Sequence, residues 1–142
     1  MGNKIKEIKP NKHFKNIRDF LKSDIQSAMH FSFKHLDINH NKFSVNERNN
    51  KYFKKIFERL KNLSTMNIRE VQNNRTKSLR VHTINWEDTT EPQGFSQLHD
   101  QLQQITAYQF EISANEHGRV HGFFIENVFF IVWFDPDHKL YN

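Results

Sequence analysis

Residues 110–141, FEISANEHGRVHGFFIENVFFIVWFDPDHKLY, decide the fold class of this chain. Apolar side chains alternate with other side chains through much of the stretch, which is typical of β-strands. Short breaks at 116–118 and 126–127 divide it into three strands, and Gly118 can supply the left-handed residue of the first turn. The stretch therefore predicts an antiparallel β-meander.

The alternation also predicts a register for this meander. A two-residue turn at 126–127 and a three-residue turn at 116–118 give the pairs Ile125–Val128, Phe123–Phe130, Asn115–Arg119, Ser113–His121 and Glu111–Phe123. One face then holds only apolar residues and glycine, and we expect it to pack on helices: Phe110, Ile112, Ala114, Val120, Gly122, Phe124, Phe129, Ile131 and Trp133.

The preceding residues supply helices and shorter strands. Residues 46–63 are the clearest helix, because the apolar side chains repeat with helical spacing and the lysines lie mostly off that stripe. A short basic helix is predicted within 9–25, with Phe14, Ile17 and Leu21 on one stripe, and a second short helix after Asn67, which Glu70 helps to cap. Strands are predicted within 28–37 and 77–86, a loop at 87–95 and a short helix within 96–105.

These elements predict an α+β fold in a single domain of residues 1–142. Residues 1–27 form a basic helical extension in this interpretation. Residues 28–142 form the core, in which an N-terminal strand and helices precede the C-terminal meander, with an insertion near 85–95.

Charge is distributed unevenly along the chain. Residues 1–80 hold 19 Lys and Arg against 7 Asp and Glu, whereas residues 81–142 hold 2 against 9. A basic half of this strength favours phosphate backbones or acidic partners, although solvated helix faces would give the same count. The chain has no cysteine, which excludes disulfides and thiolate catalysis and is compatible with the cytoplasm. No apolar run is long enough to span a membrane, so no membrane partner is expected.

Metal and cofactor motifs are not recognisable. Asp37, Asn39 and Asn41 alternate like the start of a calcium loop, but Lys42 and Arg48 replace the glycine and glutamate that such a loop needs. His117 and His121 are four residues apart, yet on a hairpin they do not share a helix face. No glycine-rich phosphate loop occurs. We expect no metal and no cofactor.

The polar end of the predicted sheet is the candidate site. Arg119 and His121 leave one strand on the same face, Glu111 faces them, and His138 and Tyr141 follow the last strand. Arg can hold a phosphate, His and Glu can move protons, and Tyr can stack on a base. Such a set could cleave RNA without metal, by deprotonating a 2′-OH and protonating the leaving 5′ oxygen. Ordinary polar residues on a solvent-exposed sheet face would give the same pattern.

Residues 110–141 resemble the RelE/ParE superfamily of toxin–antitoxin toxins, in particular the RelE- and YoeB-like members. EHGRVHGFF is similar to the Arg-bearing strand of the family, and DHKLY is similar to its closing motif. The resemblance implies that Arg119 contacts phosphate, that His138 is the closing catalytic residue and that Tyr141 is the terminal Tyr. Glu111 would correspond more loosely to the general base.

The resemblance implies a metal-independent endoribonuclease that cleaves mRNA at the ribosome, within a toxin–antitoxin or phage-defence locus, with a cognate antitoxin as partner. The basic side chains expected to hold RNA are Lys51, Lys54, Lys55, Arg59 and Lys139. Two alternatives stay open. One is a non-catalytic module that binds nucleic acid or protein through its basic helices, and the other is a ParE-like toxin directed at gyrase.

Overall fold

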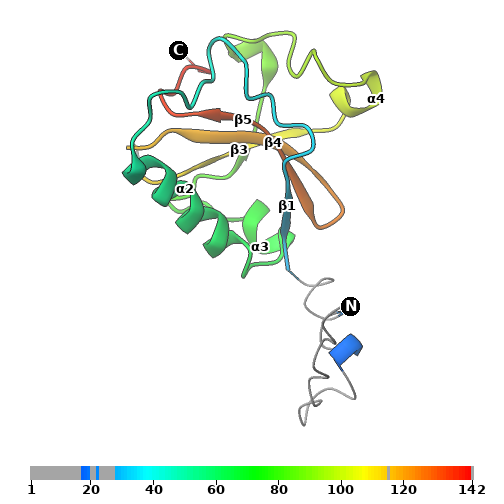
Figure 1. Cartoon of the computed structure of the whole chain (residues 1–142). Coiled ribbons are helices and arrows are strands. Elements are labelled where there is room, and N and C mark those ends of the chain that lie inside the picture. The colour runs from blue at the N-terminus through cyan, green and yellow to red at the C-terminus, as the bar shows by residue number, and fades with distance from the viewer. Residues whose placement is uncertain (1–16, 20–21, 23–27, 115, 142) are drawn as a thin grey trace, which may run out of the picture.

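A five-stranded sheet organises the chain in the computed structural model, which describes residues 17–19, 22, 28–114 and 116–141 (Figure 1). The strand order is β1-β5-β4-β3-β2. Neighbouring strands are antiparallel except at one edge, where β1 runs parallel to β5. The strands are β1 His30–Ser32, β2 His82–Thr83, β3 Ala107–Glu111, β4 Arg119–Ile125 and β5 Val128–Asp135. The predicted α+β class and C-terminal meander are confirmed.

The helices are few and mostly short. In the described residues after 28 they are α2 Asn50–Leu63, α3 Ile68–Gln72, the 3-10 turn η1 Trp86–Asp88 and α4 Asp100–Gln103. The predicted cap of α3 is confirmed, because the side chain of Asn67 accepts from the Glu70 amide and donates to the Glu70 carboxylate. Residues 17–19 are helical, but Phe14 and Leu21 lie outside the described residues. No helix in the described ranges is long and apolar enough to cross a membrane.

Helix α2 covers one face of the sheet. The side chain of Asn49 caps it by accepting a hydrogen bond from the Tyr52 amide at 3.0 Å. Its buried stripe then follows helical spacing: Tyr52, Ile56, Leu60 and Leu63. These side chains form one core with Phe110, Ile112, Val120, Phe129 and Ile131 of the meander region. This is the helix-packed face that the alternation predicts.

A second core covers the opposite face. It contains Phe43 from the segment before α2, Ile84 from the strand predicted within 77–86, Phe95 from the predicted insertion and Leu140 from the C-terminal segment. These side chains pack on Phe123, Val132 and Trp133. The predicted insertion near 85–95 therefore covers this face of the sheet as a lid. Both faces of the sheet are buried as a result.

One turn of the predicted register is confirmed and the other is wrong. The turn at 126–127 pairs Ile125 with Val128 and Phe123 with Phe130, as expected. Between β3 and β4, however, Glu111 pairs with Arg119 and Gln109 with His121, a shift of four residues. The connection spans 112–118 instead of three residues, so Ser113 does not face His121 and Ala114 is exposed in the loop. The Ser113 hydroxyl bonds the His117 ring within this loop.

A β-bulge corrects a second expectation. His121 pairs with Trp133 and Gly122 with Ile131, which leaves Val132 as an extra residue in β5. Every side chain beyond the bulge changes face. Trp133 therefore lies in the second core and not against α2, and Phe134 takes the place on the helix side.

We expect Gly118→Ala to be strongly destabilising. Gly118 has φ +78°, and an added Cβ would lie 2.0 Å from the carbonyl oxygen of Asp135 and 2.5 Å from the Cα of Pro136. The loss should reach about 2 kcal/mol or more, measured by urea denaturation.

Gly94→Ala is the matched control. Gly94 also has positive φ, +67°, but its Cβ would meet only the Trp86 side chain at 3.0 Å. This variant should lose about 1 kcal/mol. Equal losses in the two variants would mean that the contact of Gly118 with the β5 backbone is unimportant.

Candidate functional site

The predicted catalytic residues of the sheet lie in a buried polar row. Arg119 of β4 donates from Nε to Glu111 Oε1 of β3 at 3.1 Å, and the Glu111 side chain is 2% exposed. His121 Nε2 lies 3.1 Å from Asp135 Oδ2, and both side chains are at most 1% exposed. The sequence therefore predicted correctly that Glu111, Arg119 and His121 share one end of the sheet. It missed Asp135 and the lid that covers the row.

The C-terminal segment holds this lid in place. The backbone amides of Lys139 and Leu140 donate to the Asp135 carboxylate at 2.8 and 3.0 Å. Thr90 bonds the same segment twice, with its amide donating to the Leu140 carbonyl and its hydroxyl to the Lys139 carbonyl. Leu140 is fully buried. Residues 136–141 are thus a fixed strap across the end of the sheet, which we call the C-terminal strap.

Burial controls the protonation of the His121–Asp135 pair. Desolvation lowers the pKa of His121, and the hydrogen bond and charge of Asp135 only partly oppose it. Burial alone would raise the pKa of Asp135, but the hydrogen bonds from His121, Lys139 and Leu140 lower it. The arrangement is a neutral imidazole that donates to a carboxylate. With Nε2 protonated, His121 Nδ1 is an acceptor, and it has no partner among the described residues.

His138 and Tyr141 take separate places on the C-terminal strap. The Tyr141 hydroxyl accepts from the Asn85 amide at 3.3 Å, and its ring meets the His82 ring at 6.3 Å. His138 adopts a left-handed backbone, φ 54°. No hydrogen bond or ion pair in the described part of the chain joins either residue to Arg119, whose Nε is already bound to Glu111.

Four buried polar atoms near this end of the sheet have no protein partner. They are Gln109 Oε1, Glu111 Oε2, His121 Nδ1 and His138 Nε2. Buried polar atoms are usually hydrogen-bonded, and a water molecule or a ligand can satisfy such atoms. The described residues contain no group of three or more His, Asp or Glu side chains arranged to hold a metal ion.

A depression of about 520 Å³ opens at the N-terminus of α2. Arg48, Lys51, Tyr52 and His117 line it, together with Glu47 and Glu116. Burial raises the pKa of Tyr52, so this phenol stays protonated, and its hydroxyl is buried without a protein partner. Arg48 is ion-paired with Asp137 of the C-terminal strap. The acidic and basic side chains nearly balance here.

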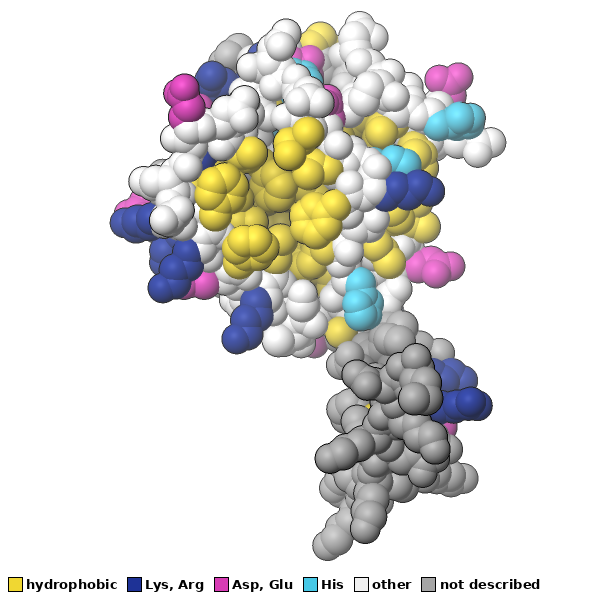
Figure 2. Space-filling view, in the orientation of Figure 1, with side chains coloured by type: hydrophobic (Ala, Val, Ile, Leu, Met, Phe, Trp, Pro, Cys, Tyr) yellow, Lys and Arg dark blue, Asp and Glu magenta, His cyan; other side chains and the backbone are white. Residues whose placement is uncertain are grey.

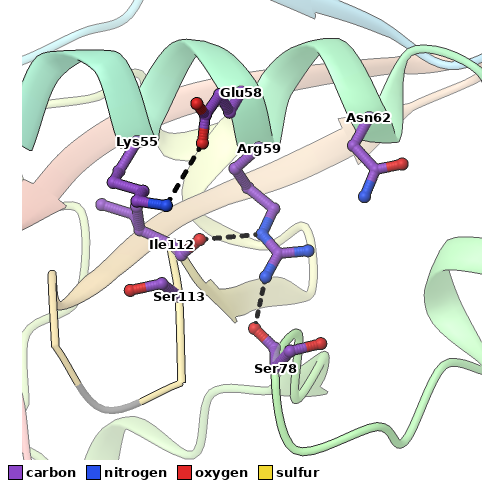
Figure 3. Close-up of a pocket in the computed structure, with 7 residues that line it drawn as sticks. All are labelled: Lys55, Glu58, Arg59, Asn62, Ser78, Ile112 and Ser113. Carbon is purple, nitrogen blue, oxygen red and sulfur yellow. Dashed lines mark hydrogen bonds and ion pairs between the residues drawn. The ribbon is translucent and has the colours of Figure 1, made fainter.

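A groove of about 300 Å³ continues along the same flank of α2 (Figure 3). Lys55, Arg59 and Asn62 project from the helix toward Ser78 and Ser113 on two loops. Arg59 Nε donates to the Ile112 carbonyl at 3.0 Å and Nη2 donates to the Ser78 carbonyl. Burial lowers the pKa of Arg59, although Glu111 partly opposes this shift. These two bonds fix the guanidinium fork in place and leave its other N–H groups for a ligand.

The predicted RNA-binding side chains divide into two sets. Lys51, Lys55 and Arg59 lie four residues apart on one flank of α2 and line the two depressions. Lys54 belongs to the other flank of the helix, and Lys139 is exposed on the C-terminal strap. Sequence reasoning missed Asn62, Ser78 and Ser113, because the groove joins three segments that are distant in the chain.

The buried pair predicts an acid-sensitive fold. Unfolded His121 titrates near pH ~6.5. Its folded pKa is lower, so below that pH the unfolded state binds a proton that the folded state does not, and stability falls. The free energy of unfolding, measured by urea denaturation, should fall from pH 7 to 5 by at most about 1.4 kcal/mol per pH unit from this proton. Asp135, whose pKa is also lowered, adds a further loss below pH ~4.

His121→Gln should flatten the loss of stability between pH 7 and 5, because it removes the titrating ring. His99→Gln is the control, at an exposed histidine whose ring caps α4, and it should keep the fall in stability that His121 causes. An unchanged slope in His121→Gln would contradict this assignment.

Comparisons of the chain with family models, with curated proteins and with solved structures find no match.

Proposed function

We propose that this protein binds the phosphate backbone of a nucleic acid. The binding site is the groove between α2 and the loops that contain Ser78 and Ser113. The donor set of the groove carries the proposal. Lys55, Arg59, Asn62 and Ser78 offer N–H or O–H groups, and the Ser113 hydroxyl beside them bonds the His117 ring. The one carboxylate, Glu58, is ion-paired with Lys55 at 3.4 Å. A phosphate needs several donors and a positive charge in one place, which this groove provides.

Neighbouring cations extend the basic surface beyond the groove. Lys51 stands one helical turn before Lys55, and Lys77 and Arg80 are exposed on the loop that carries Ser78. Long-range attraction of phosphates therefore comes from exposed lysines, while the fixed guanidinium supplies geometry.

The double variant Lys51→Glu/Lys55→Glu should weaken binding of a fluorescent RNA by about tenfold or more, measured by anisotropy at fixed salt. Its salt slope, log K against log [salt], should become shallower by about 2, because two phosphate contacts are lost. An RNA and a DNA of the same sequence, both single-stranded, serve as probes.

Lys54→Glu/Lys61→Glu is the matched control, since it makes the same charge change on the other flank of α2. It should retain most of the affinity. Equal losses in both double variants would show attraction by net charge alone and would contradict a groove-directed mode of binding.

RNA cleavage is a second candidate function, favoured by Glu111, Arg119 and His121, which lie on neighbouring strands at one end of the sheet. In this proposal Arg119 stabilises the phosphate, His138 or His121 moves protons and Tyr141 orients the substrate. The resemblance to RelE-like toxins would make mRNA at the ribosome the substrate and an antitoxin the partner. The C-terminal strap would have to move first, because Glu111 and His121 are buried.

The cleavage hypothesis predicts that the natural protein cuts RNA in the presence of a chelator. His138→Asn should abolish cutting without a large change in the urea midpoint, because Asn tolerates the left-handed backbone of this position. Gel analysis of labelled RNA, with and without ribosomes, provides the measurement. Intact RNA under both conditions would overturn cleavage while leaving phosphate binding unaffected.

A further inference from the structure

An apolar groove lies on the flank of α2 that faces away from the basic groove. It is lined by nine side chains, all of them apolar: Phe33, Leu36, Ile38, Val45, Phe53, Ile56, Phe57, Leu60 and Phe134. Its volume is about 230 Å³, and Figure 2 shows it as a hollow surrounded by hydrophobic side chains. Water would therefore contact an apolar recess at this site.

Several of the apolar side chains that line this groove are largely exposed to solvent. Phe57 is 68% exposed, Ile38 57% and Phe33 51%. They stand on both walls, Phe57 on α2 and the other two on the segment after β1. Contiguous exposed apolar surface of this kind typically marks an interaction site, whereas single exposed apolar residues do not.

The rim of this groove is basic. Lys54 and Lys61 flank Phe57 at three residues before and four residues after it, which places them beside it on the outer surface of α2. Lys34 follows Phe33 on the other wall and is exposed. The carboxylate of Asp37, on that wall, accepts from Trp133 Nε1 of the second core. Glu58 is paired with Lys55 on the far flank of the helix.

We propose that this groove binds an acidic amphipathic helix of a partner protein. Apolar side chains spaced i, i+3 or i+4, and i+7 would fill the recess, and carboxylates on either side would meet Lys34, Lys54 and Lys61. This binding is independent of the nucleic-acid function, because it uses the opposite flank of α2.

Charge and shape argue against the other occupants. A second copy docked symmetrically would bring the lysines of both rims together, and the chain carries a net charge of +5. Residues 1–27 of the chain itself contain seven Lys and Arg against three Asp and Glu, so they also match the rim poorly. An anionic membrane suits the lysines, but a bilayer surface cannot fill a recess as a helix can.

The test is a selection of helical 15-residue peptides from a displayed library on the full-length protein, with Phe57→Glu for counter-selection. We expect enrichment of peptides with an apolar stripe and acidic flanks. The best peptide should bind the Phe57→Glu variant at least tenfold more weakly than it binds the natural protein. It should also bind Lys54→Glu/Lys61→Glu less tightly, whereas Lys51→Glu/Lys55→Glu should bind it as the natural protein does.

Ile125→Ala controls for exposed apolar area, because Ile125 is 38% exposed at the turn between β4 and β5. It should bind the selected peptide normally. Three results would overturn the proposal. They are enrichment of basic or neutral peptides or of none, self-association that Phe57→Glu abolishes, and phosphatidylserine-vesicle binding that depends on Phe57 when no peptide binds. A loss of RNA binding in Lys51→Glu/Lys55→Glu alone would concern only the nucleic-acid function.

Discussion

The carboxylate of Asp135 is the constraint on which the rest of the structure depends. It is buried at the end of β5 and accepts hydrogen bonds from the ring of His121 and from the backbone amides of Lys139 and Leu140. These bonds satisfy a charge that would otherwise be costly to bury. They also turn the chain back over the sheet, so that Leu140 completes the second core and Thr90 bonds the strap.

Because the C-terminal strap covers the end of the sheet, most of the polar side chains of the sheet at that end are not accessible from solvent. Residues that alternation places on a polar face, such as Glu111 and His121, are enclosed by the strap and by the lid around Phe95. Helix α2, in contrast, exposes a possible binding surface on each of its two flanks. One carries Lys51, Lys55 and the fixed Arg59, and the other carries exposed Phe57 between lysines. Nucleic-acid binding and partner binding can therefore be separated by substitution within a single helix.

Short-range patterns predicted most elements of the fold. The stripe of α2, the Asn67–Glu70 cap and the turn at 126–127 each depend on residues within one or two turns of each other. The register of β3 depends on more distant contacts, since Gly118 packs on the backbone of Asp135 and the Glu111 amide donates to Leu79. The bulge at Val132 has no local signal, so Trp133 was placed on the wrong face. The basic side chains of the site could be predicted, but the loops that complete the groove could not.

The central claim is that nucleic acid binds the flank of α2 that carries Lys55, with the C-terminal strap closed. Amide NMR spectra of the full-length protein, titrated with a short single-stranded RNA, test it most directly. We expect shifts at the amides of Lys55, Ser78 and Ser113, with the amides of Lys139 and Leu140 unchanged. Shifts centred on the strap and Arg119, with those of the groove unchanged, would contradict it.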